Sequence, residues 1–284
     1  MELKGVARMH YLSAALALIV SAWALPVGAW GPIGHRVSAE IAARNISGET
    51  RAQIALILGS ETLADASTVP DEQRQNPDPF WQETASPYHY VTLPGGRRVD
   101  QLEHPPEGDA LTALERFTAT LRDPAASLEA KQLALRFIVH IVADLHMPLH
   151  VGNGGDRGGN DMRVIWFGEP QTLHWVWDEG LVVRKQLSST EYAERLARRT
   201  TPEQVIAWWD PRPATWMQES ADLRDRIYPQ TGEEQGQGTQ GSPVTLDWQY
   251  DYDWSPAMEL RLKQSGVRLA AYLRWVFADV PAPG

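Results

Sequence analysis

Hydrophobic positions along most of the chain repeat at the spacing of amphipathic helices. From Pro32 to Arg44, the residues Ile33, Val37 and Ile41 are four positions apart and therefore fall on one helical face. Pro32 suits a first turn, because the first N–H groups of a helix have no acceptor within it. Similar patterns predict further helices over residues 48–58, 110–121, 128–145, 190–199, 202–227 and 255–277. The helix over residues 128–145 is the most apolar of these and should be buried.

Two short segments alternate between apolar and polar residues, as strands do. Residues 88–93 run into the turn signal Pro-Gly-Gly, and residues 162–167 run into Gly-Glu-Pro. Residues 231–242 (TGEEQGQGTQGS) have nothing to pack and are predicted to form a loop. No repeat and no linker divides the rest. The pattern therefore predicts one all-α, mainly helical domain with small β-ribbons.

The N-terminus has the layout of a secretory signal peptide. Lys4 and Arg8 precede the run YLSAALALIVSAWAL, and Pro-Val-Gly-Ala follows it. The run is shorter than the roughly 20 apolar residues that a membrane span needs. We therefore expect cleavage after Ala29, which removes residues 1–29 and leaves a domain of residues 30–284 beginning at Trp30. The product would be secreted or periplasmic, without stable membrane association.

Composition narrows the possible chemistry. The formal net charge of −10 argues against a broad basic surface that binds nucleic acid by releasing counterions. Bound divalent cations could attract phosphate instead and would neutralise acidic residues. The chain has no cysteine, so any metal must be held by His, Asp, Glu or backbone atoms. An exported chain without cysteine is also typical of a bacterial source.

Three of the eight histidines lie in HIVADLHMPLH, residues 140–150. His140 and Asp144 are four positions apart, so a helix places both on one face, within reach of one ion. Pro148 disfavours helix at the preceding residue, which should end the helix and turn His150 toward a second coordination sphere. Taken alone, a His-x3-Asp pair also fits two hydrogen-bonded residues in a core.

The same spacing recurs at His174 and Asp178. His35 follows the predicted new N-terminus by five positions, His89 lies among apolar residues, and Asp71 lies in a predicted loop. One such histidine is usually structural, but several with paired aspartates and no cysteine favour a multi-metal site.

These motifs together resemble the zinc-dependent single-strand nucleases of fungi, plants and bacteria, the S1/P1 or type I nucleases. They occur in the family's order as Trp30-Gly-x2-Gly-His35, Asp71-x2-Arg74, Tyr88-His89-Tyr90, His140-x3-Asp144-x3-Pro148-Leu149-His150, Gly158-Gly159-Asn160 and His174-x3-Asp178. The resemblance covers residues 30–178 directly and implies a helical fold of the phospholipase C/nuclease P1 type. The family's disulfides have no counterpart here.

The resemblance implies a centre of three zinc ions. The implied ligands of the first ion are Asp71, His89, His140 and Asp144. Those of the second ion are His35, the bridging carboxylate of Asp144, and the α-amino group and carbonyl oxygen of Trp30. Those of the third ion are His150, His174 and Asp178. A backbone amine can bind metal only when it is free, which is a physical reason for the signal peptide to be cut immediately before Trp30.

The implied activity is hydrolysis of single-stranded DNA and RNA to products with 5′-phosphates, together with 3′-nucleotidase activity. Asp71 would orient the attacking water, Asp144 would hold two ions, and Arg74 would stabilise charge on the phosphoryl oxygens. No protein partner is implied.

Three residues are candidates for binding the single strand. Tyr90 is a stacking platform for an unpaired base, although a packed strand tyrosine explains it about as well. Asn160 follows two glycines that allow close backbone approach, and Arg157 stands where it could contact phosphate. His146 is expected to be a core histidine or to support a ligand, and His104 to lie on the surface.

Two alternatives stay open. Secreted phospholipases C resemble this zinc site, but they place the first histidine farther from the N-terminal Trp and use Glu as the last ligand, where this chain has Asp178. A periplasmic zinc-binding protein without catalysis would explain the ligands but not Arg74.

Overall fold

The computed structural model describes residues 30–229 and 242–278, and it is mainly helical, as predicted. The predicted signal peptide lies outside the described residues, as does the predicted loop apart from its last residue. The longer helices are α1 (Pro32–Asn45), α2 (Gly48–Leu58), α5 (Ala110–Arg122), α6 (Leu128–Asp144), α9 (Ser189–Arg198), α10 (Pro202–Trp208), α11 (Pro213–Ile227) and α12 (Trp248–Phe277). Short helical turns connect them, including α3 (Leu63–Ala66), α4 (Val69–Glu72), η3 (Ser86–His89), η5 (Pro148–His150), α7 (Leu173–Trp175), η6 (Val176–Gly180) and α8 (Leu181–Val183).

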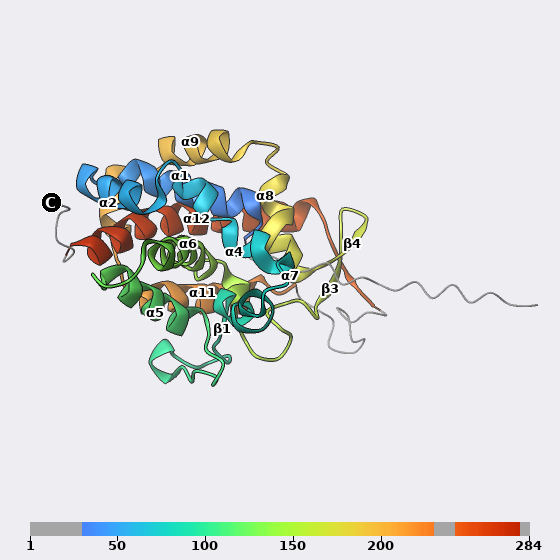
Figure 1. The fold of residues 1–284 in the computed structure, drawn as a ribbon. Helices are drawn as coiled ribbons and strands as arrows, with labels where there is room; N and C mark the ends of the chain where they lie inside the picture. The colour runs from blue at the N-terminus through green and yellow to red at the C-terminus, as the bar shows by residue number, and fades with distance from the viewer. Residues whose placement is uncertain (1–29, 230–241, 279–284) are drawn as a thin grey trace, which may run out of the picture.

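Helix α12 lies at the centre of the helical core. In Figure 1, α12 runs between α1 and α9 on one side and α6 on the other, and it packs against all three. Every residue of α6 from Phe137 to Asp144 is buried, which confirms the prediction from its apolar sequence. Helix α5 covers the far side of α6. The polar residues of α6 are therefore held inside a rigid helical core.

Side-chain caps explain where several helices begin. Ser47 Oγ accepts a hydrogen bond from the backbone N–H of Thr50 at the start of α2, and Ser127 Oγ does the same for Ala130 in α6. At α9, Ser188 and Glu191 form a reciprocal capping box. Such caps satisfy N–H groups that the first helical turn leaves without acceptors. The observed bounds of these helices lie within one residue of the predicted ones.

Two predicted helices were wrong in extent. The single helix expected over residues 202–227 is divided into α10 and α11, because Pro211 and Pro213 cannot donate the backbone hydrogen bonds that would continue a helix. The helix expected from residue 255 begins earlier, at Trp248, where the Asp247 side chain accepts from the Gln249 N–H. It continues through Pro256.

The strands are shorter than predicted. Only Val91–Thr92 of the first segment forms a strand, β1, which pairs in parallel with β2 (Val151–Gly152). The second segment forms β3 (Arg163–Trp166), which pairs antiparallel with β4 (Glu169–Thr172) and parallel with β5 (Val244–Leu246). The pairing of β1 with β2 brings Tyr90 and His150 to the same region, which matters for the site.

Within the described ranges, no helix has the length and apolar character needed to cross a membrane.

Candidate metal centre

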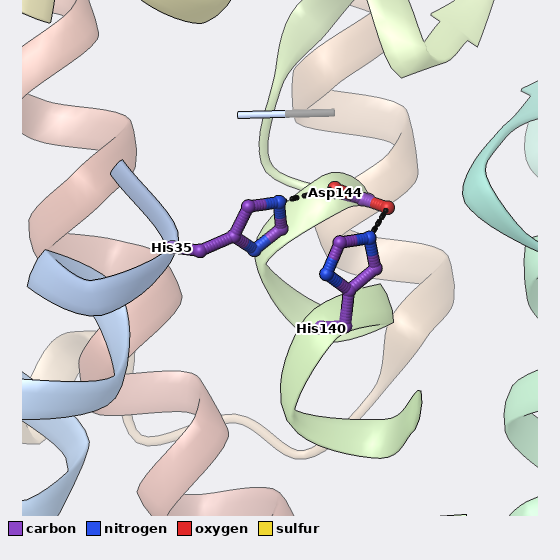
Figure 2. Close-up of side chains that lie close together, drawn as sticks. All are labelled: His35, His140 and Asp144. Carbon is purple, nitrogen blue, oxygen red and sulfur yellow. Dashed lines mark ion pairs between the residues drawn. The ribbon is translucent and has the colours of Figure 1, made fainter. Parts of the chain in front are cut away.

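Asp144, the last residue of α6, lies at the centre of a buried polar cluster. Its carboxylate oxygens lie 3.3 Å from His35 Nε2, 3.1 Å from His140 Nε2 and 3.4 Å from His89 Nδ1. Figure 2 shows His35 on α1 and His140 on α6 pointing at the two oxygens of this carboxylate. The His35 and His140 rings are stacked, with centroids 4.0 Å apart. The predicted one-turn spacing of His140 and Asp144 therefore does place both side chains in one site.

Asp71 and His89 complete this cluster from two short turns. Asp71 Oδ1 in α4 lies 3.8 Å from His89 Nδ1 and 3.9 Å from His140 Nε2. Arg74 is one helical turn beyond Asp71, and its Nε lies 2.8 Å from Asp71 Oδ1. The alternation of residues 88–93 predicted that His89 lies in a strand, and this was wrong. His89 is the last residue of the turn η3, because Pro87 favours the start of a helical turn there. Two groups of side chains that could hold a metal ion result: His35–His140–Asp144 and Asp71–His89–His140.

A third group lies beside the first two. His174 Nε2 is 2.9 Å from Asp178 Oδ2, and His150 Nε2 is 3.7 Å from Asp178 Oδ1. Helix α6 ends at Asp144 and Pro148 begins the turn η5, so the predicted change of direction before His150 is confirmed. His150 Nδ1 is also 3.9 Å from Asp144 Oδ2, which makes the third group adjacent to the others.

Backbone carbonyl groups fix the tautomers of three of these imidazoles. The Nδ1–H of His140 donates to Ser67 O (2.8 Å), that of His150 to His89 O (2.5 Å) and that of His174 to Gly158 O (2.7 Å). In each ring the other nitrogen, Nε2, is therefore directed at a carboxylate of the cluster. Metal-ligating histidines are commonly held in this way.

Several buried polar atoms of the cluster make no hydrogen bond of suitable geometry with the described residues, although some of them lie within 4 Å of a group that could carry the opposite charge. They are both ring nitrogens of His35, both oxygens of Asp144, both oxygens of Asp178, and Nε2 of His150. Leaving such atoms unpaired in a core costs free energy, and a bound cation would satisfy them. Their identities, nitrogen and carboxylate oxygen without sulfur, suit zinc. The donor set thus fits the implied metal.

In the metal-free protein, the histidines of the cluster differ in pKa. Burial lowers the pKa of His35, and burial together with the charge of Arg74 lowers the pKa of His89 to about 4. Burial also opposes charge on His150, but the carboxylates of Asp144 and Asp178 outweigh it and raise the pKa to about 9. The pKa of His140 is raised against the effect of burial by Asp144 and Asp71. Metal binding near neutral pH must therefore displace a proton from His150.

Trp30 lies next to the third group. Its side chain is fully buried and packs on the first turn of α1, since a Cβ added to Gly34 would lie 3.1 Å from Trp30 Cβ. The adjacent Gly31 N–H donates to the carbonyl oxygen of Asp178 (3.0 Å). The predicted N-terminus of the mature chain is therefore tied to the turn that carries a predicted ligand.

The predicted substrate residues line one cavity of about 340 Å³. These residues are Tyr90, Arg157 and Asn160. The wall also includes Arg74 and three candidate ligands from two of the groups, His89, His150 and His174. Tyr90 is 47% exposed, which excludes the alternative of a packed strand tyrosine. Arg157 has a φ of 52° and forms an exposed ion pair with Asp161 (2.5 Å).

Sequence reasoning missed Glu179, whose half-buried carboxylate lies against Gly31. A Cβ at position 31 would come within 2.0 Å of Glu179 Oε1, so only glycine fits there without displacing that side chain. The pKa of Glu179 is raised to about 7, first by burial and then by the charges of Asp178 and Asp71. No helical spacing pointed to it, because its contact is with a residue that precedes it by 148 positions.

His146 belongs to a different network. Its Nδ1–H donates to Val142 O (2.7 Å), and its Nε2 lies 3.3 Å from Arg268. Burial, followed by the charges of Arg261 and Arg268, lowers its pKa, so it is neutral. It is a core histidine, one of the two roles expected for it. His104, expected on the surface, is partly exposed and pairs with Asp109 (2.7 Å).

The S1/P1 Nuclease family model matches residues 30–278. The chain belongs to the S1/P1 nuclease family. It is 28% identical to Endonuclease 4 of Arabidopsis thaliana, over 89% of this chain and 90% of that protein, and 27% identical to Endonuclease 2 of the same plant, over 92% and 96%. It is also 30% identical to Nuclease S1 of Aspergillus oryzae, over 54% of each chain.

Membership of the S1/P1 family supports hydrolysis of nucleic acid and favours the nuclease over both alternatives. The matched part begins at Trp30, the residue expected to start the mature chain. These relatives are plant and fungal, so a bacterial origin of this S1/P1 family member stays a prediction.

Proposed function

We propose that this S1/P1 family member is a zinc-dependent phosphodiesterase that cleaves single-stranded DNA and RNA to products with 5′-phosphates. We further propose that it removes terminal 3′-phosphates from nucleotides, since these present the same bond. The observation that carries the proposal is the position of His89, His150 and His174, which belong to the polar groups and also line the cavity beside exposed Tyr90. A base held at Tyr90 would have its phosphate next to these imidazoles.

The proposed cofactor is three zinc ions, one for each group of ligands. Asp71, His89, His140 and Asp144 would hold one ion, and His150, His174 and Asp178 another. His35 and Asp144 would hold the remaining ion with the α-amino group and carbonyl oxygen of Trp30. Zinc at such a site lowers the pKa of a bound water and polarises phosphoryl oxygens.

The chain's own residues would prepare the phosphate for attack. Arg74 is held by Asp71 at 2.8 Å and lines the cavity, so its guanidinium would lie beside an oxygen of the phosphate. The pairing also keeps Asp71 ionised, since its pKa is lowered, against the effect of burial, by His140 and by Arg74. An ionised Asp71 can accept a proton or a hydrogen bond from the attacking water.

The cavity wall would hold the nucleoside. Tyr90 would stack on an unpaired base, an interaction that contributes about 1–3 kcal/mol per base. Asn160 Nδ2 donates to Arg157 O (2.9 Å), while its buried Oδ1 has no partner among the described residues. That oxygen is an acceptor for a hydroxyl or amino group of the substrate. A base paired in a duplex could not reach this pocket, which explains a preference for single strands.

Export completes the proposal. Cleavage after Ala29 would free the α-amino group of Trp30 and release the protein to the periplasm or medium. The proposed partners are single-stranded nucleic acid and nucleotides, without a stable membrane contact or protein partner.

The test is hydrolysis by the processed protein of heat-denatured DNA, duplex DNA, a nucleoside 3′-phosphate and phosphatidylcholine, with zinc content measured on the same sample. The proposal expects cleavage of denatured DNA and of the 3′-phosphate, and little cleavage of duplex DNA. Lipid cleavage without DNA cleavage would identify a phospholipase C. A full zinc complement with no phosphodiester cleaved would identify a binding protein.

A further inference from the structure

A second cavity, of about 640 Å³, also has Tyr90 in its wall but none of the predicted metal ligands. Tyr90 and Thr92 line both cavities, so these two side chains form the wall between them. Their positions follow from alternation along β1: Tyr90 and Thr92 are exposed, whereas Val91 and Leu93 are buried in the core. We call the second space the distal cavity. It shares the side chains of Tyr90 and Thr92 with the proposed site.

The distal cavity presents groups that suit a nucleotide. Arg97 is exposed on its wall, and its guanidinium makes no hydrogen bond or ion pair with the described residues, although its backbone N–H donates to Pro94 O (3.1 Å). A guanidinium without a carboxylate partner is available to a phosphate. Pro87, Pro94 and Pro105 add apolar surface against which a base can lie. Both parts of a nucleotide therefore have a counterpart in the wall.

A histidine of the wall is held in one orientation. His104 Nδ1 lies 2.7 Å from Asp109 Oδ2, and Asp109 is fixed because its other oxygen accepts the N–H of Thr112 at the start of α5. The Nδ1–H is thereby engaged, and Nε2 remains for a ligand. An oriented imidazole in a cavity wall has a defined hydrogen-bonding capacity toward a bound molecule.

The charge of the distal cavity indicates how strongly it would bind. Glu103 and Glu107 also line it and outnumber Arg97, so the charged side chains of the wall sum to −1. Such a cavity would not concentrate phosphates by itself, but it can accommodate one phosphate at Arg97 and accept hydrogen bonds from base amino groups at the carboxylates. It suits a nucleotide that is already delivered by a neighbour on the same strand.

We propose that the distal cavity binds the nucleotide next to the one stacked on Tyr90, so that a single strand crosses the Tyr90–Thr92 wall. This proposal rests on the proposed nuclease function and adds a second subsite to it. The enzyme should then favour oligonucleotides over mononucleotides, because only the former reach Arg97. Mononucleotide hydrolysis should not depend on Arg97 at all.

The experiment compares kcat/KM for a nucleoside 3′-phosphate and for a single-stranded tetranucleotide at one ionic strength. The variants are Arg97→Glu and the matched control Arg98→Glu. Arg98 is the neighbouring residue, has a 73% exposed side chain, pairs with Asp100 and does not line the cavity. Zinc content and thermal unfolding of each variant establish that it is folded and loaded.

The proposal expects wild type and Arg98→Glu to cleave the tetranucleotide alike, and Arg97→Glu to lose about tenfold on it, a change of about 1.4 kcal/mol, with unchanged mononucleotide hydrolysis. Equal losses for both variants would indicate a general effect of charge and overturn the subsite, as would an Arg97→Glu variant that keeps wild-type rates on both substrates. If the zinc-loaded wild type cleaves neither substrate, the proposed function itself fails.

Discussion

The backbone N–H of Gly31 donates a hydrogen bond to the carbonyl oxygen of Asp178, 3.0 Å away. This bond joins the second residue of the predicted mature chain to the turn that carries a predicted ligand of the third ion. The start of the predicted mature chain is therefore tied to the turn that carries Asp178. Cleavage of the signal peptide during export would add the α-amino group of Trp30 to the proposed metal site.

The first prediction concerns the free amine of Trp30. Protein that keeps even one residue before Trp30 should bind less zinc than protein that starts at Trp30, because a peptide nitrogen is a poor metal ligand. The measurement is zinc per chain after dialysis, for protein beginning at Ala29 and at Trp30. Equal zinc content and equal activity would show that the amine is not a ligand.

The second prediction concerns Asp144, which would bridge two ions. Asp144→Asn should lower zinc content and reduce cleavage of denatured DNA by more than about 100-fold, since a metal ligand should matter at least as much as the groups supporting it. Asp100→Asn, an exposed residue paired with Arg98, is the control and should behave as wild type. Substantial cleavage by Asp144→Asn with full zinc would contradict the bridging role.

The third prediction concerns pH and metal binding. The pKa of His150 is raised to about 9, so at pH 7 the metal-free protein carries a proton that zinc must displace. Zinc affinity should therefore rise with pH up to about 9. Calorimetry in two buffers of different ionisation enthalpy should show proton release at pH 7. A buffer-independent heat would show that the cluster is unprotonated.

The fourth prediction follows from the same shift. The folded-state pKa of His150, about 9, lies above the unfolded value of about 6.5, so its protonation stabilises the metal-free protein fully below about pH 6.5. That contribution is lost as pH rises through 9. Melting temperatures of metal-free protein should fall between pH 6.5 and 9, and those of zinc-loaded protein should not. Parallel curves would contradict the assignment.

The fifth prediction concerns Arg261, which contacts the chain just after the C-terminal end of α6. Arg261 is buried, donates from Nε to His146 O (3.0 Å) and pairs with Glu219 (2.5 Å). Arg261→Met should cost about 3–5 kcal/mol of unfolding free energy, because it removes the donor to the buried carbonyl oxygens of His146 and Trp216. Arg198→Met, which breaks an exposed pair with Glu194, should cost less than about 1 kcal/mol. Denaturant unfolding of metal-free protein measures both, and similar losses would show that the Arg261 network is not structural.

Local signals in the sequence predicted much of the helical fold. Pro32 and the four-residue spacing after it located α1, and Ser47, Ser127 and Ser188 begin helices where caps are expected. The division near Pro211 could have been predicted from the two prolines, which the single helix expected over residues 202–227 did not take into account. The turn at His89 was mistaken for a strand because alternation over Tyr88–Tyr90 is equally consistent with a helical turn after Pro87.

The candidate ligands were easier to predict from the sequence than the residues that pack around them. His140 and Asp144 share a helical face by spacing alone, and the turn at Pro148 follows from proline chemistry. The partners of His146 could not be predicted, because Arg261 and Arg268 are more than a hundred residues away. Glu179 and the distal cavity likewise depend on long-range packing that no local pattern encodes.

The most direct test of the account is a crystal structure of the processed protein with anomalous scattering measured at the zinc edge. The account predicts three peaks, one in each group of ligands, and a bond of about 2.0–2.2 Å from the Trp30 α-nitrogen to one of them. Fewer than three peaks, or a Trp30 nitrogen pointing away from His35 and Asp144, would contradict it.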